Sequence, residues 1–162
     1  MVILGVDPGS RRTGYGAITS VADRAQLIES GTIAPPPSES LEQRLRHIHS
    51  AITAVIERLR PEVLAVEDVF HSNNARTALV LGHVRGVILL AGAQAGLDVQ
   101  AYSPATVKLD VAGFGRADKR QVALMVQRHL GLQGAADPGD PTDALAVALC
   151  HAHSCRTLGL VR

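Results

Sequence analysis

The order of apolar patterns along the chain constrains its fold more than any other feature. Residues 1–6 form a short apolar run rich in β-branched side chains, which stops at Asp7-Pro8-Gly9. This pattern indicates a buried strand that ends in a turn. Residues 13–21 and 26–33 follow with strand-like patterns and short links. Three strands in succession predict an antiparallel meander.

Helical patterns then alternate with two further strand-like runs. Apolar residues recur at helical spacing over residues 40–60, and a second helical pattern, rich in small residues, covers 73–96. The short runs 63–66 and 99–102 each follow one of these helices. This alternation predicts an α/β fold with a mixed five-stranded sheet and helices on both faces.

The rest of the chain has helical patterns separated by loops. A short helix is expected from Pro104, a longer one over residues 118–130, and a last one from Pro141 to about Cys155. The 162 residues suit one domain of ordinary size, and the sequence contains no internal repeat. We therefore expect residues 1–162 to form a single domain.

Composition narrows the cellular setting. Hydrophobic residues make up 46% of the chain, but only two Tyr and two Phe are present, so the core must be aliphatic. Two cysteines are too few for a disulfide framework, which favours a reducing compartment. The N-terminus lacks the basic segment of a signal peptide, and the apolar stretch 87–95 is too short to span a membrane. These features predict a cytoplasmic protein without a membrane partner.

Overall charge by itself argues against a strong nucleic-acid binder. The net charge is +1, from 16 basic and 15 acidic residues, and phosphate contacts need Lys and Arg. Basic residues nevertheless cluster at Arg11-Arg12 and again at Arg116, Lys119 and Arg120. If several acids hold metal ions, the remaining surface is more basic than the sum suggests.

Acidic residues occur where an α/β sheet builds its sites. Asp7 and Glu67 end the first and fourth strands, and Asp140 and Asp143 stand three apart at the start of the last helix. Four carboxylates at one place would repel one another unless cations lie among them. Carboxylate oxygens suit Mg²⁺ or Mn²⁺, and two such ions about 4 Å apart can activate water and stabilise the leaving oxygen of a phosphodiester.

Each acidic segment also has an ordinary structural explanation. Asp7-Pro8-Gly9 fits a turn, Glu67 fits an exposed strand end, and Asp140 to Asp143 fits a helix start with its capping acids. The glycines of residues 5–16 could instead let backbone amides approach an anion, although no phosphate-loop fingerprint is complete. The joint occurrence of the acids favours a metal site, but spacing alone does not exclude chance.

Five segments resemble, in order, the RuvC family of Holliday-junction resolvases. They cover nearly the whole chain, which makes the resemblance specific. The matching residues are Gly5-Val6-Asp7-Pro8-Gly9-Ser10 with Thr13-Gly14-Tyr15-Gly16, Val66-Glu67-Asp68-Val69-Phe70, Asn74 with Ala78, Leu81-Gly82 and Arg85-Gly86-Val87, Val107-Lys108 with Gly113, Gly115, Ala117-Asp118-Lys119 and Gln121-Val122, and Asp140-x-x-Asp143-Ala-Leu-Ala-Val-Ala with His151 and His153.

This resemblance implies a ribonuclease-H-like fold and a homodimer that makes paired, symmetric nicks in four-way DNA junctions. It also implies two Mg²⁺ or Mn²⁺ ions per active site, a role in homologous recombination and DNA repair, and a RuvA–RuvB branch-migration partner. The alternatives are an RNase-H-like nuclease that acts on RNA or another branched nucleic acid, and a junction-binding module without turnover.

The resemblance also assigns roles to single residues. It makes Asp7, Glu67, Asp140 and Asp143 the metal ligands, with Lys119 part of the catalytic set. Lys108 and Lys119 match residues that contact phosphate near the scissile bond, and Phe70 matches an aromatic that stacks on a junction base. We add Arg11, Arg76 and Arg116 to the expected DNA-binding residues.

Four further expectations can be checked against a structure. Asp137 is a rival to Asp140, but it lies in a loop, six residues before Asp143. His151 and His153 are expected at an interface or on the surface, since spacing two separates them on a helix. Asp110 is expected to add negative charge near the DNA path. Gly82 and Gly86 would allow close helix approach, either in a dimer or on the monomer's own sheet.

Overall fold

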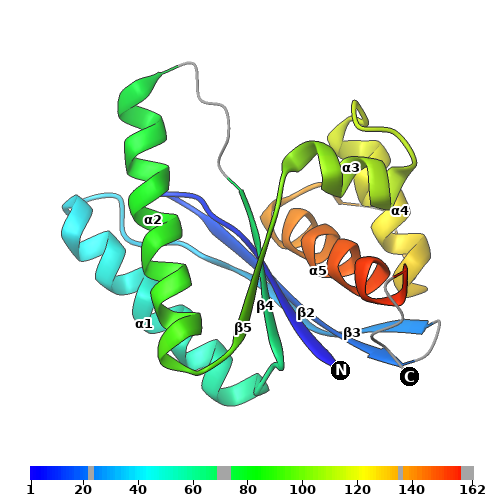
Figure 1. Ribbon diagram of the computed structural model, residues 1–162. Helices are drawn as coiled ribbons and strands as arrows, with labels where there is room; N and C mark the ends of the chain where they lie inside the picture. Colours follow the sequence, from blue (N-terminus) through cyan, green and yellow to red (C-terminus); the bar gives the residue numbers. More distant parts are fainter. Residues whose placement is uncertain (22–23, 69–73, 135–136, 158–162) are drawn as a thin grey trace.

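The computed structural model describes residues 1–21, 24–68, 74–134 and 137–157 (Figure 1). The elements follow the predicted order, with most bounds shifted by one or two residues. They are β1 (Val2–Asp7), β2 (Thr13–Val21), β3 (Arg24–Ile33), α1 (Leu41–Leu59), β4 (Val63–Glu67), α2 (Ala75–Gln94), β5 (Asp98–Tyr102), α3 (Pro104–Ala112), α4 (Lys119–Leu130) and α5 (Asp140–Thr157).

The five strands form one mixed sheet in the order β3-β2-β1-β4-β5. β1, β2 and β3 pair as an antiparallel meander, as predicted. β1 pairs with β4 in parallel, with Val6 opposite Val66, and β4 pairs with β5 in parallel. The carboxyl ends of β1, β4 and β5 therefore meet at the same edge of the sheet.

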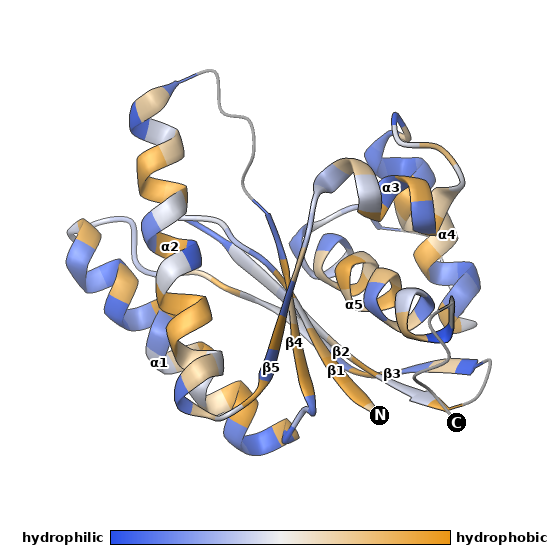
Figure 2. Ribbon diagram, viewed as in Figure 1, coloured by the Kyte–Doolittle hydropathy of each residue, from blue (hydrophilic) through white to orange (hydrophobic). Residues whose placement is uncertain are grey.

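Helices cover both faces of the sheet, as predicted. Figure 1 shows α1 and α2 on one face and α3, α4 and α5 on the other. Leu4 packs into the α1–α2 core and its neighbour Ile3 into the α3–α5 core, because successive strand residues point to opposite faces. β1 and β4 are buried on both sides, so their sequences are apolar runs rather than alternating ones (Figure 2).

Glycines let α5 lie unusually close to the first hairpin. A Cβ atom on Gly5 would overlap the carbonyl oxygen of Ala144, and one on Gly14 would overlap that of Asp140. A Cβ on Gly16 would lie 2.6 Å from Leu145 Cγ. Helix packing thus explains why Gly14 and Gly16 lack side chains, without an anion-binding loop. The same packing sets the start of α5 beside the end of β1.

Helix α2 carries an apolar surface that the described chain only partly covers. Val84 and Ile88 are buried against α1 and the sheet, whereas Leu79 and Leu90 are 63% and 49% exposed. By length and composition alone the helix could cross a membrane, and only about a fifth of its most apolar stretch is buried inside the protein. The expectation from residues 87–95 therefore underestimated the apolar length of this helix. Core helices of soluble proteins pass the same test.

The two histidines of α5 differ in their exposure. His151 is 5% exposed, and its Nδ1 lies 2.8 Å from the hydroxyl of Tyr102. The side chain of His153 is 17% exposed and its Nδ1 lies 2.6 Å from a carboxylate oxygen of Asp110. The prediction of surface or interface histidines is therefore wrong for His151, because α3, α4 and the sheet enclose α5.

Candidate active site

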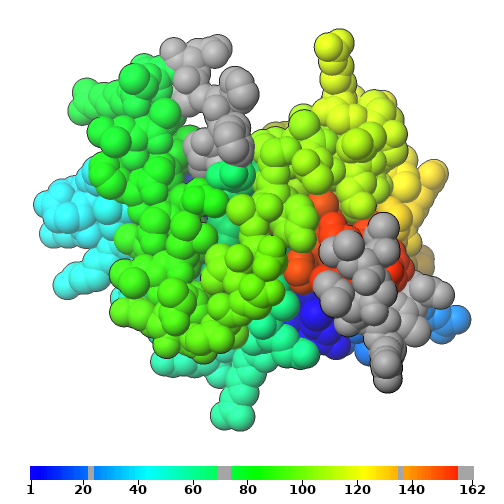
Figure 3. Space-filling view, viewed as in Figure 1, coloured from blue at the N-terminus to red at the C-terminus, as the bar shows by residue number. Residues whose placement is uncertain are grey.

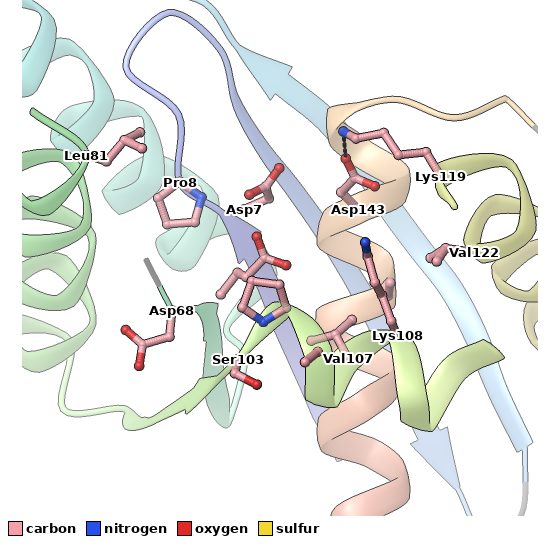
Figure 4. A pocket seen from close by; sticks show the side chains of 14 residues that line it. Asp7, Pro8, Asp68, Leu81, Ser103, Val107, Lys108, Lys119, Val122 and Asp143 are labelled. Atoms are coloured by element: carbon pink, nitrogen blue, oxygen red, sulfur yellow. Dashed lines mark hydrogen bonds and ion pairs between the residues drawn. The ribbon is translucent and has the colours of Figure 1, made fainter. Parts of the chain in front are cut away.

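A cavity of about 700 Å³ opens at the carboxyl ends of β1 and β4. Its walls come from the ends of both strands, from α2, from the end of β5 and the following α3, from the start of α4 and from the first turns of α5. Figure 4 shows side chains from these elements converging on one space. The lining residues are Asp7, Pro8, Glu67, Asp68, Leu81, Ser103, Pro104, Ala105, Val107, Lys108, Lys119, Val122, Asp143 and Ala146.

Strand periodicity turns both strand-end acids toward α5. Ile3 and Ala65 pack in the core beneath α5, and residues two and four further along a strand share the same face. Asp7 and Glu67 are the last residues of β1 and β4, and the register that pairs Val6 with Val66 sets them side by side. The expectation that these two strand ends are parallel neighbours is therefore confirmed.

The two strand-end carboxyls are protonated more readily than usual. Burial, followed by repulsion from Asp143, raises the pKa of Asp7 to about 6. Burial, followed by repulsion from Asp7, raises the pKa of Glu67 to about 8. The negative charge of Asp7 thus favours the protonated form of Glu67. Negative charge is concentrated here beyond what the surroundings stabilise.

Asp143 reaches the cavity from the first turn of α5, where it faces a lysine. Its Oδ2 lies 2.7 Å from the Nζ of Lys119, as Figure 4 shows by a dashed line. Lys119 is the first residue of α4, which Asp118 and Gln121 begin with a capping box. The hydrogen bond from Lys119 to Asp143 raises the pKa of Lys119. A cation at a helix start is unfavourable for the dipole, and Asp143 offsets that cost.

Asp140 lies at the margin of this site and not in the cavity wall. Its Oδ2 lies 2.5 Å from the Nε of Arg12, which comes from the link between β1 and β2. Asp137, the rival acid, is exposed, and its backbone carbonyl accepts a hydrogen bond of 2.8 Å from the Thr142 hydroxyl. The structure thus brings three of the four expected acids into one cavity and holds the fourth beside it.

The donor set fits a hard divalent cation. The acids in the cavity offer only oxygen ligands, and the raised pKa values of Asp7 and Glu67 mark charge that a cation would relieve. Across the described ranges, however, no three Asp, Glu, His or Cys side chains are already gathered around one point. Asp143 and Asp140 are each turned toward a basic side chain.

The expected DNA-binding residues lie on several elements, and the two lysines among them line the cavity. Lys108, on α3, lines the cavity, and Figure 4 shows its amino group pointing to the side where Asp143 lies. Arg11, Arg76 and Arg116 are exposed, in the β1–β2 link, the first turn of α2 and the α3–α4 connection respectively. Phe70 lies outside the described residues.

Sequence reasoning missed the contribution of β5. Ser103 and Pro104 follow this strand directly and line the cavity, at the same sheet edge as Asp7 and Glu67. Asp68, beside Glu67, forms an ion pair of 3.2 Å with Arg85 of α2. The strand-end rule that found Asp7 would also have found Ser103 if it had been applied to the fifth strand.

A mixed sheet in this order, with acids at neighbouring strand ends and at a facing helix start, defines a ribonuclease-H-like nuclease. The family model described as "Crossover junction endodeoxyribonuclease RuvC" matches residues 3–151. The chain belongs to this family, whose nucleases are metal-dependent.

Relatives and solved structures agree with this assignment. The chain is 46% identical over 156 residues to the RuvC protein of Syntrophomonas wolfei, covering 96% of this chain and 91% of the relative. It is 49% identical over 152 residues to that of Moorella thermoacetica, covering 94% and 91%. The structure described as "T. thermophilus RuvC in complex with Holliday junction substrate" superposes with a TM-score of 0.90 at 39% identity, covering 97% and 96%.

A solved structure of much lower sequence identity has the same fold. The yeast mitochondrial Holliday junction resolvase has a TM-score of 0.70 at 12% identity, covering 98% of this chain and 80% of the other. At that identity the match supports the ribonuclease-H-like fold and nothing about individual side chains.

Proposed function

We propose that Asp7, Glu67, Asp143 and the adjacent Asp140 hold the divalent ions with which this RuvC-family endonuclease cuts four-way DNA junctions. The enzyme resolves Holliday junctions by paired, symmetric nicks during homologous recombination and DNA repair. The observation that carries the site assignment is the pair of half-buried strand-end carboxyls with raised pKa values, which share one cavity with Asp143.

The chain's own residues would prepare the site in distinct ways. Asp7 and Glu67 are fixed by paired strands, so their carboxylates need little reorganisation to act as ligands. Two Mg²⁺ or Mn²⁺ ions bound there would activate a water molecule and stabilise the leaving oxygen. Asp143 and Asp140 would complete the ligand set from the helix, and each would give up its present basic partner to do so.

Lys119 and Lys108 are proposed to hold the phosphate that is cut. Lys119 belongs to the catalytic set in this assignment, since its ammonium stands 2.7 Å from Asp143. Lys108 lines the same cavity from α3. Arg11, Arg76 and Arg116 would contact phosphates further along the DNA, and Phe70 would stack on a junction base. Support for Phe70 comes from the family pattern, and support for the three arginines comes from their exposure.

A homodimer is proposed to form through α2. Cβ atoms added to Gly82 or Gly86 would meet no atom within 4 Å, so the backbone of this helix surface is open to close approach. The exposed Leu79 and Leu90 supply apolar area on the same helix. A two-fold dimer would present two active sites to a two-fold junction, which is the simplest route to symmetric cuts.

Three wider assignments rest on family membership. Residues 1–162 would form one nuclease domain, and the family model spans most of that length, 3–151. We also propose a cytoplasmic location and cooperation with the RuvA–RuvB branch-migration complex. No described residue singles out the surface that such a complex would contact.

Substrate choice separates this function from its alternative. The purified protein would be given a synthetic four-way junction, a linear duplex of the same sequence and an RNA–DNA hybrid, each with Mg²⁺ or Mn²⁺. We expect nicks in two opposing strands of the junction, at symmetric positions, and little cutting of the other substrates. Faster cleavage of the hybrid would contradict junction resolution and support the RNA-directed alternative.

A further inference from the structure

An exposed aromatic ring stands in the turn between α3 and α4. Phe114 is 46% exposed and is the only aromatic among the large exposed hydrophobic residues of the described chain. The whole sequence has only two Phe and two Tyr. A ring of this size gains free energy by being covered, so its exposure in an aromatic-poor protein calls for an occupant.

The turn holds Phe114 in a fixed place. Gly113 adopts a left-handed conformation with φ of 85°, and its N–H donates a 2.9 Å hydrogen bond to the Leu109 carbonyl, which ends α3. The Phe114 carbonyl then accepts a 3.2 Å hydrogen bond from Ala117. Gly115 lies against α3, where an added Cβ would stand 3.5 Å from the Ala105 carbonyl. A ring presented by a rigid turn loses little conformational entropy on contact.

The surroundings of this ring are basic. Arg116 is exposed two residues later, and Lys108 and Lys119 lie on the helices that flank the turn. The nearby acids are already engaged, since Asp110 faces His153 at 2.6 Å and Asp118 caps α4 through the Gln121 N–H at 2.9 Å. The carboxylate of Asp110 is therefore turned toward α5. Aromatic side chains among basic ones are typical of a surface that contacts nucleic acid.

The turn also continues one wall of the active site. Pro104, Ala105, Val107 and Lys108 of α3 and Lys119 of α4 line the cavity. In Figures 1 and 3 the α3–α4 segment rises on one side of the upper surface and α2 on the other. A DNA strand whose phosphate lies between Lys108 and Lys119 would leave the cavity along the α3–α4 segment or along α2.

We propose that Phe114 stacks against a nucleotide of the junction DNA on the α3–α4 side of the active site. This inference rests on the proposed DNA-cutting function of the cavity. Phe114 does not reach the reacting atoms, so it contributes to substrate affinity and to the path of the strand rather than to the chemical step. Stacking uses the face of a base or sugar, so the contact tolerates any sequence.

A tryptophan at this position would report the contact with DNA through its fluorescence. The chain contains no Trp, so Phe114→Trp creates a single reporter. The variant would be titrated with a synthetic four-way junction without divalent metal, so that the signal reports binding and not cleavage. We expect a saturable change in tryptophan emission. In matched titrations we expect Phe114→Ala to raise Kd about tenfold and Phe114→Tyr to stay within about twofold of the parent.

Salt dependence distinguishes stacking from a phosphate contact. Phe114→Ala should leave the slope of log Kd against log salt unchanged, whereas Arg116→Gln should lower it by about one. In the cleavage assay Phe114→Ala should raise KM about tenfold with kcat nearly unchanged. The matched control is Ile28→Ala on β3, which removes a side chain of similar exposure, 44%, from the edge strand. We expect parental affinity from this control.

The proposal is overturned if the tryptophan emission of the Phe114→Trp variant stays constant while a labelled junction is shown by polarisation to be bound. Parental Kd and KM in Phe114→Ala would overturn it equally. If Phe114→Ala is less stable than the parent, the Phe114→Trp and Phe114→Tyr variants still decide the question. Failure of the parent to cut junctions would instead contradict the proposed function, and the metal-free binding signal would be unaffected by that result.

Discussion

Two pairs of acids meet in this site, and their surroundings differ. Asp7 and Glu67 end paired strands, and no basic side chain of the described residues stands within ion-pair distance of either. Asp140 and Asp143 begin α5, and each faces a basic side chain, at 2.5 Å from Arg12 and 2.7 Å from Lys119. The protein compensates the charge of the first pair only in part, through Lys119, whereas each acid of the second pair has a basic partner in direct contact.

This difference indicates where a cation matters most. The pKa values of about 6 and 8 show that Asp7 and Glu67 resist ionisation in the folded protein without metal. A bound cation would reverse this by favouring both carboxylates. The helix-start pair depends instead on the position of α5, which the glycines of the first hairpin fix. The ionisation of the strand-end pair thus depends on nearby charge, whereas the position of the helix-start pair depends on the packing of α5.

Removing one strand-end charge should have the largest effect on cleavage. Asp7→Asn keeps the side-chain shape but removes a ligand, so we expect the junction-cleavage rate to fall about a thousandfold or more at saturating Mg²⁺. Junction affinity should be kept, because less negative charge faces the DNA. The control is Asp98→Asn, an exposed acid at the opposite end of β5, which should cleave at the parental rate. Parental cleavage by Asp7→Asn would show that the metal-site assignment is wrong.

Neutralising the lysine that faces the helix-start pair should have the next largest effect. Lys119→Gln removes the ammonium beside Asp143, and we expect kcat to fall about a hundredfold through lost stabilisation of the phosphate. Single-turnover kinetics at saturating enzyme would separate this loss from weaker binding. Arg120→Gln, the next residue on α4, is an exposed control of the same charge change. Equal kinetics for both variants would argue that Lys119 only adds to general electrostatic attraction.

Packing beneath α5 should affect stability. Gly5→Ala places a methyl group against the Ala144 carbonyl, so α5 must move, and we expect a loss of about 1–3 kcal/mol in urea unfolding. Gly115→Ala meets only an ordinary contact of 3.5 Å and should change stability by less than about 0.5 kcal/mol. If the two alanines have equal effects, close packing of α5 on β1 does not set the position of the helix-start acids.

The strand-end pair should make metal-free stability fall as pH rises. Both carboxyls have raised pKa values, so the folded protein binds their protons more tightly than the unfolded chain does. Their contribution is complete below pH about 4 and is lost as pH rises through the folded-state pKa values of about 6 and about 8. We expect a decline of about 1–3 kcal/mol between pH of about 5 and about 8.5, measured by urea unfolding in EDTA.

A glutamine variant tests whether the strand-end carboxyls cause this pH dependence of stability. Glu67→Gln cannot ionise, so its metal-free stability should vary much less over the same range. Adding Mg²⁺ at a pH of about 8 should stabilise the parent and leave Glu67→Gln nearly unchanged. If the parent and Glu67→Gln show the same dependence on pH, the strand-end pair is not its source.

The sequence predicted the strand-end acids better than the helix-start acids. The placement of Asp7 and Glu67 can be predicted from local sequence, because each is the last residue of its strand. Parallel neighbouring strands end at the same edge of a sheet, so their last residues lie close together. The pairing of Asp140 with Arg12 joins residues 128 apart in sequence and depends on side-chain conformation, which no local pattern encodes. The burial of His151 was missed for a related reason, since it depends on the packing of α3, α4 and the sheet around α5.

The metal site itself can be observed directly. Crystals of the protein soaked with Mn²⁺ would be measured at a wavelength where manganese scatters anomalously. We predict at least one anomalous peak between Asp7 and Glu67, about 2.1 Å from carboxylate oxygens, and its loss in Asp7→Asn crystals. Peaks only at other positions, or an unchanged peak in the Asp7→Asn crystals, would contradict the assignment of these strand-end carboxylates as the metal ligands.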